Sequence, residues 1–314
     1  MATLSRMRTI GAAIIGCAVL LIVFPGAARS GTAALADARR IVDDAGRTIT
    51  VDRPFRRIIS LYPAHTENLF ALDAGDQVVG VSPSETYPRE ALQKPVFSSH
   101  DGAEKFLAAQ PDLILARPMI DQAYGPLLAQ LEGLGIKVVS VQPHTVAEMF
   151  TYWRILGTLT GSSTRADQMI AEFERSVAEF RRRAPAADQR PKVYFESIHG
   201  KMKTFAPESM AVFALTTAGG VNIAADAEPV SGTNIAAYGK EKLLERGAEI
   251  EVYLAQVGPM NRTSLEIIRN EPGFQVIRAV REGRVFLIDE GLVSRPTMRL
   301  LDGIAAIAQQ IYPN

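Results

Sequence analysis

The sequence contains a single cysteine, Cys17, which lies in an apolar run near the N-terminus. A chain processed beyond this run has no cysteine, so disulfides are excluded and a metal would need nitrogen or oxygen ligands or methionine sulfur. Polybasic runs are also lacking, and 34 basic residues balance 34 acidic ones. The sequence therefore predicts no nucleic-acid partner.

The N-terminal apolar run is too short for a membrane span. Residues 10–24 are uncharged and mostly apolar, whereas a span requires roughly 20 such residues. Two arginines precede the run and small residues follow it, which is typical of a secretory signal peptide. The Ala34-Leu35-Ala36 pattern predicts cleavage after its last residue, so residues 1–36 are predicted to be a signal peptide. The remainder would carry 31 basic and 34 acidic residues, a net charge of −3.

An alternative for the N-terminus is a lipid anchor. The run Ile14-Ile15-Gly16-Cys17 resembles a lipoprotein processing box, in which lipid would be attached to the cysteine. Seven apolar residues follow Cys17, where a lipoprotein usually turns polar. A cleaved signal peptide is therefore the favoured prediction.

Residues 37–144 are predicted to form an α/β lobe. Four short runs rich in aliphatic residues predict strands, and they carry so little polar alternation that helices should cover both faces of the sheet. These strands are residues 58–61, 78–81, 113–116 and 138–141. Helical patterns separate them, as in a parallel sheet with crossover helices. These helices are residues 66–72, 103–109 and 122–134, and a hairpin at residues 41–51 precedes them all.

Residues 145–184 are predicted to be linker helices. Thr145 and Glu148 form a capping-box pattern at the start of the first helix, and Gly161 ends it. A second start signal at Thr164 opens a helix that should run unbroken for roughly 20 residues, or about 30 Å. A helix of this length is expected to join two lobes, with a cleft between them.

Residues 185–314 are predicted to form a second α/β lobe. The strand candidates are residues 193–195, 252–254 and 285–288. The helix candidates are residues 210–217, 240–245, 264–269 and 297–311, with Pro296 in the first turn of the last. The predicted fold class is therefore α/β, with two Rossmann-like lobes of mainly parallel sheets, one long connecting helix and a ligand cleft between the lobes.

Candidate metal-binding groups follow the predicted strands, where open parallel sheets bind ligands. The loops supply imidazole, phenol and carboxylate groups suited to a transition metal. The candidates are Tyr62, His65, Tyr87, His100, Glu196 and His199. Among them, His65, His100 and His199 are predicted to contact a metal through a bound chelate. The alternative for each histidine is a capping or surface role, and His65 could simply begin the following helix.

Positive charge is a second feature of these loops. Arg262 and Arg295 are predicted to bind an anionic ligand, because a guanidinium can donate two parallel hydrogen bonds to carboxylate or catecholate oxygens. Lys201 and Lys203 lie in the same group of loops. The alternative is that these side chains are ordinary solvated surface charges.

Several runs resemble the periplasmic-binding proteins of iron-siderophore, haem and cobalamin ABC importers, the class III family with two lobes joined by a single helix. The similarity covers essentially the whole chain after the signal. The runs are residues 57–72 (RIISLYPAHTENLFAL), 78–81 (VVGV), 87–88 (YP), 111–116 (PDLILA), 44–47 (DAGR), 134–138 (LGIKV), and Arg295-Pro296 with Arg299.

The resemblance implies a binding protein in the periplasm that has no cofactor of its own. Its cargo would be an iron or cobalt chelate, and its partners an inner-membrane ABC permease with its ATPase. By motif, Glu104 and Glu241 match the glutamates with which the family's cobalamin binder docks on arginines of its permease. The protein is expected to be a monomer and not an enzyme.

Two other functions are compatible with the sequence. One is an exported protein that captures a bare transition-metal ion. The other is an exported metalloenzyme that uses His65, His100, Glu196 and His199 around an activated water. The sequence contains no His-Glu-x-x-His run, nucleophile elbow or phosphate-binding glycine loop to support the enzyme.

Overall fold

The computed structural model describes residues 39–312. The predicted signal peptide, its cleavage site and Cys17 lie outside these residues. Every helix within the described part of the chain is too short or too polar to cross a bilayer.

The first lobe has a four-stranded sheet with the order β4-β3-β5-β6, and all its pairings are parallel. Its strands are β3 (Ile58–Ser60), β4 (Val78–Val81), β5 (Leu113–Ala116) and β6 (Lys137–Ser140). An antiparallel hairpin of β1 (Arg39–Val42) and β2 (Thr48–Val51) precedes them. All four residues of β5 are buried, as expected for a strand covered on both faces. The hairpin and the four strands confirm the predictions for this lobe.

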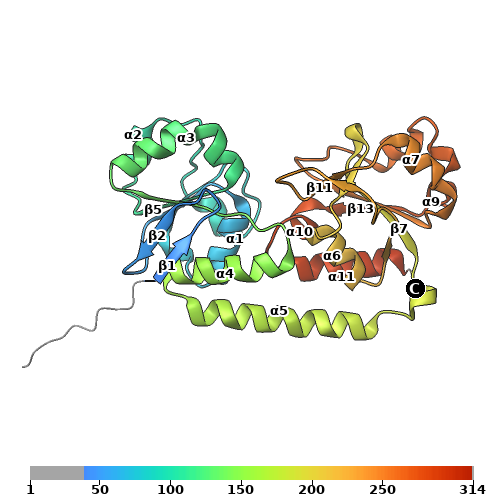
Figure 1. Cartoon of the computed structure of the whole chain (residues 1–314), viewed down its shortest axis with the longest axis horizontal. Helices are drawn as coiled ribbons and strands as arrows, with labels where there is room; N and C mark the ends of the chain where they lie inside the picture. Colours follow the sequence, from blue (N-terminus) through green and yellow to red (C-terminus); the bar gives the residue numbers. More distant parts are fainter. Residues whose placement is uncertain (1–38, 313–314) are drawn as a thin grey trace, which may run out of the picture. The chain divides into compact units, whose positions relative to one another are not determined.

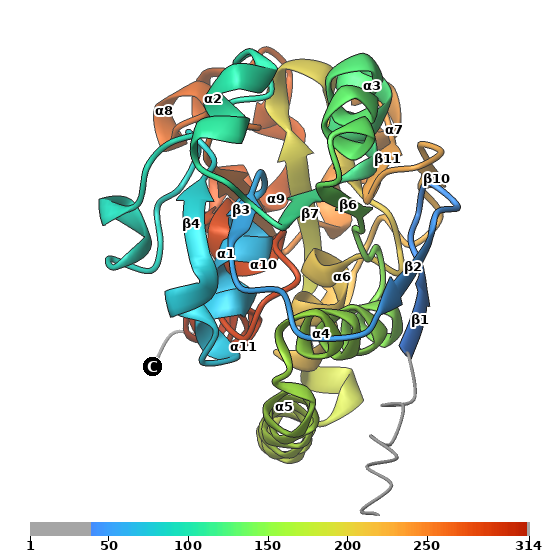
Figure 2. The same cartoon turned by 90° about the vertical axis from the view of Figure 1, so that its left-hand side faces the viewer.

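Helices cover both faces of this sheet. They are α1 (Pro63–Ala71), α2 (Ala103–Ala108), α3 (Pro118–Gly133) and, from the linker, α4 (Val146–Thr160). One hydrophobic cluster joins α2 and α3 to one face, and another joins α1 and α4 to the opposite face, an arrangement visible in Figure 2. Helix α3 begins four residues earlier than predicted and has non-helical dihedral angles at Tyr124. Pro126 explains this kink, because proline removes a backbone donor and clashes with the preceding turn.

The linker consists of α4 and α5 (Ser163–Arg183), which has 21 residues. The predicted capping box is present: Glu148 N donates to Thr145 Oγ1, and Thr145 N donates to Glu148 Oε2, each at 3.2 Å. Gly161 ends α4 in the left-handed region at φ 79°. The prediction that Thr164 begins the second helix was wrong. The chain turns directly after Gly161, and Ser162 is already the N-cap of α5.

The capping box gives a direct stability prediction. Thr145→Ala should lower the free energy of unfolding by about 1 kcal/mol, because a backbone amide of the first turn loses its acceptor. Urea unfolding measures this change. Thr164→Ala is the matched control, since Thr164 is exposed on α5 and makes no side-chain hydrogen bond within residues 39–312. Equal losses in both variants would contradict a capping role for Thr145.

The second lobe has a seven-stranded sheet in which three parallel strands were predicted and four short strands were not. The parallel strands are β7 (Lys192–Ile198), β12 (Val252–Val257) and β13 (Val285–Asp289). The unpredicted strands are β8 (Lys203–Phe205), β9 (Val221–Asn222), β10 (Glu228–Pro229) and β11 (Ile235–Ala237). Three of them, β8, β10 and β11, pair antiparallel, so this sheet is mixed. Strands of two or three residues are too short to show a period in the sequence.

Six helices of the described chain belong to the second lobe. They are α6 (Met210–Thr217), α7 (Lys240–Glu245), α8 (Leu265–Asn270), α9 (Arg278–Arg281), α10 (Glu290–Val293) and α11 (Leu300–Ile311). Helices α6 and α7 have the predicted bounds. The prediction that Pro296 lies in the first turn of the last helix was wrong, because α11 begins four residues later. The Pro296 carbonyl instead accepts hydrogen bonds from Asn68 and Trp153 of the other elements.

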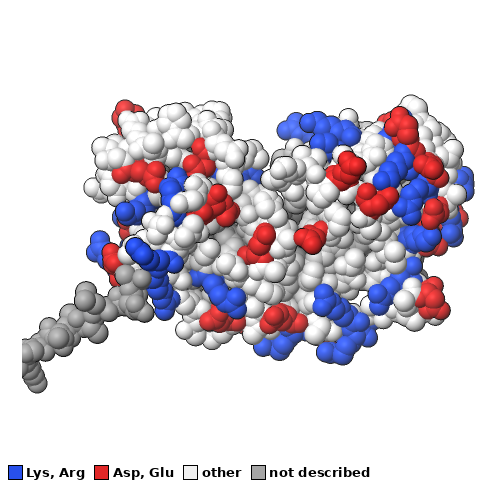
Figure 3. Space-filling view, viewed as in Figure 1, with Lys and Arg blue, Asp and Glu red and all other residues white. Residues whose placement is uncertain are grey.

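Helix α5 runs alongside both lobes (Figure 1). Its buried face includes Phe173, whose ring lies 5.7 Å from Trp153 of α4 and 6.1 Å from Phe213 of α6. One hydrophobic cluster continues from the first lobe through α4 and α5 into α6 and α11. The lobes therefore share a packed base, and the hollow between them lies on the other side (Figure 3).

Candidate ligand-binding site

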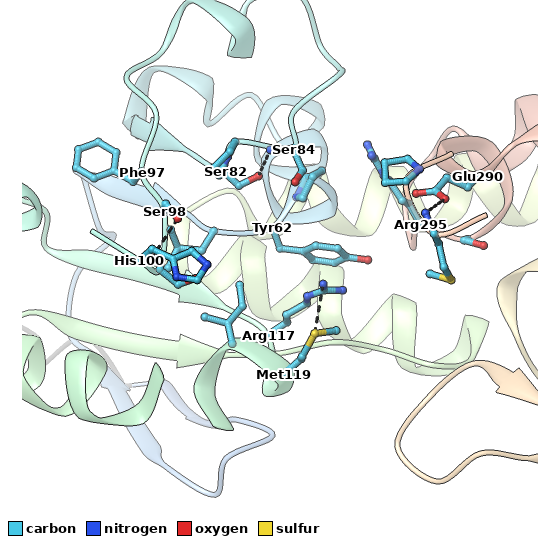
Figure 4. Close-up of a pocket in the computed structure, with 18 residues that line it drawn as sticks. Tyr62, Ser82, Ser84, Phe97, Ser98, His100, Arg117, Met119, Glu290 and Arg295 are labelled. Carbon is cyan, nitrogen blue, oxygen red and sulfur yellow. Dashed lines mark hydrogen bonds between the residues drawn. The ribbon is translucent and has the colours of Figure 1, made fainter. Parts of the chain in front are cut away.

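A cavity of about 580 Å³ lies between the two lobes, a volume in the range of small-molecule sites. Thirteen of its lining residues come from the first lobe and five from the second. Figure 4 shows Tyr62, His100, Arg117 and Met119 on one side and Glu290 and Arg295 on the other. The lining mixes aromatic, methionine, serine and charged side chains, so the cavity can contact both apolar and polar parts of a ligand.

The strand order explains why these residues meet. Tyr62, Ser82 and Arg117 follow the neighbouring parallel strands β3, β4 and β5. Their carboxyl ends lie at one edge of the sheet, which is where ligands bind in folds of this kind. In the second lobe, Met260 follows β12 and Glu290 follows β13 in the same way.

Arg117 is the cavity's uncompensated cation. Within residues 39–312 it forms no ion pair with a carboxylate, and its buried Nε has no hydrogen-bond partner. Its guanidinium carbon lies 4.8 Å from the centre of the Tyr62 ring, a cation–π contact. Burial raises the pKa of Tyr62, so this phenol stays neutral at physiological pH and does not cancel the charge of Arg117.

Arg295, which was predicted to bind the ligand, also lines the cavity, but its charge is compensated. Its Nη1 donates to Glu67 Oε1 of α1 at 2.6 Å and lies 3.4 Å from Thr86 Oγ1. Only 9% of Arg295 is exposed. The cavity therefore contains two arginines with different electrostatic environments.

His100 is the one predicted histidine that lines the cavity. Its ring is exposed and lies edge-on to the ring of Tyr124, with Tyr124 Oη 2.9 Å from Nε2. Tyr124, which contacts His100 but does not line the cavity, was not among the predicted residues. The kink in α3 includes this tyrosine, and the nearby Pro126 was the only sequence signal that the helix would be irregular there.

The structure corrects the metal-contact prediction for His65. This residue lies inside α1 and is fully buried. Its Nδ1 is 2.7 Å from Tyr152 Oη and its Nε2 is 2.8 Å from the Ala116 carbonyl oxygen. Burial lowers the pKa of His65 to about 4. Both ring nitrogens are engaged with protein groups, so neither is open to a metal in the cavity.

His199 and Glu196 also lie away from the cavity lining. They belong to a buried network of the second lobe, in which Glu196 accepts hydrogen bonds from His199 Nδ1 at 2.7 Å, from Asn261 Nδ2 at 3.0 Å and from the Tyr253 hydroxyl. The hydrogen bond to Glu196 raises the pKa of His199. His199 Nε2 lies 3.5 Å from Glu271, an ion-pair distance. The hydrogen bonds of this network give both residues a structural role in the second lobe, and neither residue lines the cavity.

The other predicted residues lie on the surface. Tyr87 is 46% exposed and its ring centre is 4.5 Å from the guanidinium carbon of Arg299, outside the cavity lining. Arg262 is exposed and also outside the lining. Glu104 and Glu241 are exposed in the first turns of α2 and α7. Across residues 39–312, no three histidine, cysteine, aspartate or glutamate side chains are grouped to hold a metal ion.

Known proteins share both this sequence pattern and this fold. The family model described as periplasmic binding protein matches residues 58–292. An uncharacterized ABC transporter substrate-binding lipoprotein of Bacillus subtilis is 27% identical over 279 residues, which are 87% of this chain and 85% of the relative. A cobalamin-binding protein of Halobacterium salinarum is 26% identical over 276 residues, 86% of this chain and 73% of the relative.

A solved structure agrees with this assignment. A protein of Staphylococcus epidermidis described as a possible iron-binding (periplasmic solute-binding) protein is 26% identical, with a TM-score of 0.71. The match covers 83% of this chain and 100% of the solved one. The chain therefore belongs to the periplasmic binding protein family, as a substrate-binding protein of the ABC-transporter type.

Proposed function

We propose that the protein binds an anionic metal chelate in the cavity between its lobes and delivers it to an inner-membrane permease. The negative charge of the ligand is inferred from Arg117, which lines the cavity and has no carboxylate partner in the described chain. A buried or half-buried guanidinium without a counter-charge is costly unless a ligand supplies the negative group. Carboxylate, phosphate or catecholate oxygens would fit its fork of donors.

The rest of the lining supports a chelate rather than a bare ion. Phe97 and the two exposed methionines of the lining, Met119 and Met260, offer apolar and adaptable surface for an organic ligand. Serine hydroxyls at Ser82, Ser98 and Ser294 can bond its polar groups. A chelate brings its own metal ligands, so the cavity needs few. We propose cobalt or iron as the metal of the chelate, because one relative is named for cobalamin and one structural neighbour for iron.

Delivery would use the two exposed glutamates. Glu104 and Glu241 lie on different lobes, each in the first turn of a short helix. We propose that they contact arginines of a permease that works with an ATPase, with the protein acting as an exported monomer in the periplasm. Exposed ion pairs of this kind contribute only about 0–1 kcal/mol each, so their main effect would be on orientation.

Lobe closure is expected to be small. The hydrophobic cluster that runs through α4 and α5 joins the bases of both lobes, and packed interfaces of this kind resist large hinge rotation. Small-angle scattering with and without ligand should therefore show only a slight compaction. A large decrease in radius of gyration on binding would contradict this expectation.

A titration panel tests the proposed function. The purified protein would be titrated with hemin, cyanocobalamin, a ferric tris-catecholate, a ferric hydroxamate and free Fe³⁺, Zn²⁺ and Ni²⁺, followed by quenching of Trp153 emission and by calorimetry. We expect an anionic chelate to bind with a dissociation constant below about 1 μM. Failure of every chelate, or tight binding of a free ion alone, would contradict the proposal and favour the bare-ion alternative.

A further inference from the structure

Glu67 of α1 is a buried carboxylate shared by two arginines of the other lobe. Its Oε1 lies 2.6 Å from Arg295 Nη1 and 3.5 Å from Arg299 Nη1. The side chain of Glu67 is 2% exposed, and its second oxygen, Oε2, has no hydrogen-bond partner in the described chain. A buried carboxylate is costly unless its charge is balanced, and here the two arginines supply the balancing charge.

These contacts are the only salt bridges that join residues 39–144 to residues 185–312 within the described chain. Uncharged groups also join the two lobes at this contact, which we call the seam; it consists of Glu67, Asn68, Trp153, Arg295, Pro296 and Arg299. Asn68 Nδ2 and Trp153 Nε1 both donate to the Pro296 carbonyl oxygen, at 2.9 and 3.2 Å. Arg295 is therefore held in place by the bond of its side chain to Glu67 and by the hydrogen bonds to the carbonyl oxygen of the adjacent Pro296.

The seam and the cavity share one residue. Arg295 lines the cavity, whereas Glu67 and Arg299 do not. Glu67 therefore acts on a ligand from behind the lining, through the position and charge of Arg295. A loop of the first lobe also contacts these two arginines. Thr86 Oγ1 lies 3.4 Å from Arg295 Nη1, and the Arg299 guanidinium lies over the Tyr87 ring.

We infer that Glu67 is a positioning and charge-specificity residue of the cavity. It holds Arg295 against the first lobe and cancels much of its charge, which leaves Arg117 as the cation that selects the ligand. The cavity then favours a ligand with one compact anionic group over a ligand with several. This inference rests on the proposed function only in treating the cavity as the ligand site.

The test changes charge without changing shape. Glu67→Gln keeps the side-chain length and one oxygen acceptor for Arg295, but it removes the negative charge. The probe is pyrophosphate, a compact polyanion that contains no metal, so the result does not depend on whether chelates bind. We expect the dissociation constant for pyrophosphate, measured by calorimetry, to fall about tenfold, because Coulomb interactions remain strong near a partly buried site.

A second variant distinguishes charge from loosening of the seam. Arg299→Met removes a positive charge behind the cavity and leaves the shorter pair of Glu67 with Arg295 in place. It should weaken pyrophosphate binding, the opposite of the effect of Glu67→Gln. A seam that merely loosened would weaken binding in both variants. Trp153 emission in the ligand-free proteins reports whether the seam is intact, since this is the chain's only tryptophan.

Glu174→Gln is the matched control, because Glu174 is exposed on α5 and forms no ion pair within residues 39–312. It removes the same charge from an exposed position outside the cavity lining and should leave the dissociation constant unchanged. Opposite shifts in the two seam variants, with no shift in the control, would support the inference. Equal or weaker pyrophosphate binding in Glu67→Gln with unchanged tryptophan emission would overturn it, as would weaker binding in both seam variants.

Discussion

Replacing Arg117 by methionine is expected to weaken binding of the anionic chelate that binds most tightly in the titration panel about 100-fold, or about 2.7 kcal/mol. The guanidinium has no carboxylate partner in the described chain and stacks on Tyr62 at 4.8 Å, so a ligand anion is the partner that its position favours. Removing one member of a desolvated charged pair typically costs 2–5 kcal/mol. Calorimetric titration of both proteins with the same chelate measures the difference.

Two further variants make this result specific. Arg117→Lys keeps the charge but loses the planar fork and much of the ring contact, so an intermediate loss of about tenfold is expected. Arg175→Met is the control, because Arg175 is exposed on α5 and likewise has no carboxylate partner within residues 39–312. Unchanged affinity in Arg117→Met would remove this residue from the ligand site and leave the anionic specificity without support.

Acidification from pH 6.5 to pH 4 is expected to destabilise the protein through His65. Burial lowers the pKa of His65 to about 4 in the folded state, whereas an unfolded histidine has a pKa of about 6.5. The unfolded state therefore binds the proton first as the pH falls. The contribution of neutral His65 to the free energy of unfolding is fully present above about pH 6.5. It is lost progressively as the pH falls to about 4, by on the order of 3 kcal/mol.

The measurement is urea unfolding of the wild type and of His65→Gln between pH 4 and pH 8. Glutamine does not titrate and can retain a hydrogen bond to Tyr152 or to the Ala116 carbonyl. The variant should be less stable than the wild type at pH 8, and the difference should shrink toward pH 4. A constant difference across this range would show that His65 does not titrate as its burial predicts.

His199 acts in a different pH window and does not obscure this result. The hydrogen bond to Glu196 raises its pKa, so its protonated form is favoured by folding. That stabilisation is present below about pH 6.5 and is lost as the pH rises through the raised pKa. Its loss on alkalinisation is therefore opposite in direction to the loss caused by His65 on acidification.

Local signals explain what the sequence predicted well. The capping box at Thr145, the glycine at position 161 and the apolar stripe of α5 all involve residues within one or two helical turns. Helices α6 and α7 also have their predicted bounds. The four strands of the first lobe are buried on both faces, which produces continuous aliphatic runs that sequence patterns detect.

The site was harder to predict, because its assignment depends on contacts between distant residues. Glu67 and Arg295 are separated by 228 positions, and nothing local indicates that one cancels the charge of the other. Arg117 was not predicted as a site residue: it directly follows the predicted strand at residues 113–116, but its lack of a carboxylate partner cannot be read from the sequence. Only His100 of the three candidate histidines lines the cavity.

His65 and His199 show why loop position alone misled the prediction. Both follow a strand closely, as a ligand-binding residue would. His65 turns inward because α1 begins at Pro63, earlier than expected, and places the ring beside Tyr152. His199 turns toward Glu196 of its own strand. Side-chain direction after a strand depends on tertiary neighbours, which a single sequence does not contain.

A crystal structure of the protein with its co-purified ligand would show whether a chelate occupies the cavity between the lobes. We expect a metal chelate there, with an anionic group at the Arg117 guanidinium and organic surface against Met119 and Met260. A ligand bound elsewhere, for example beside the network of Glu196 and His199 in the second lobe, would contradict it.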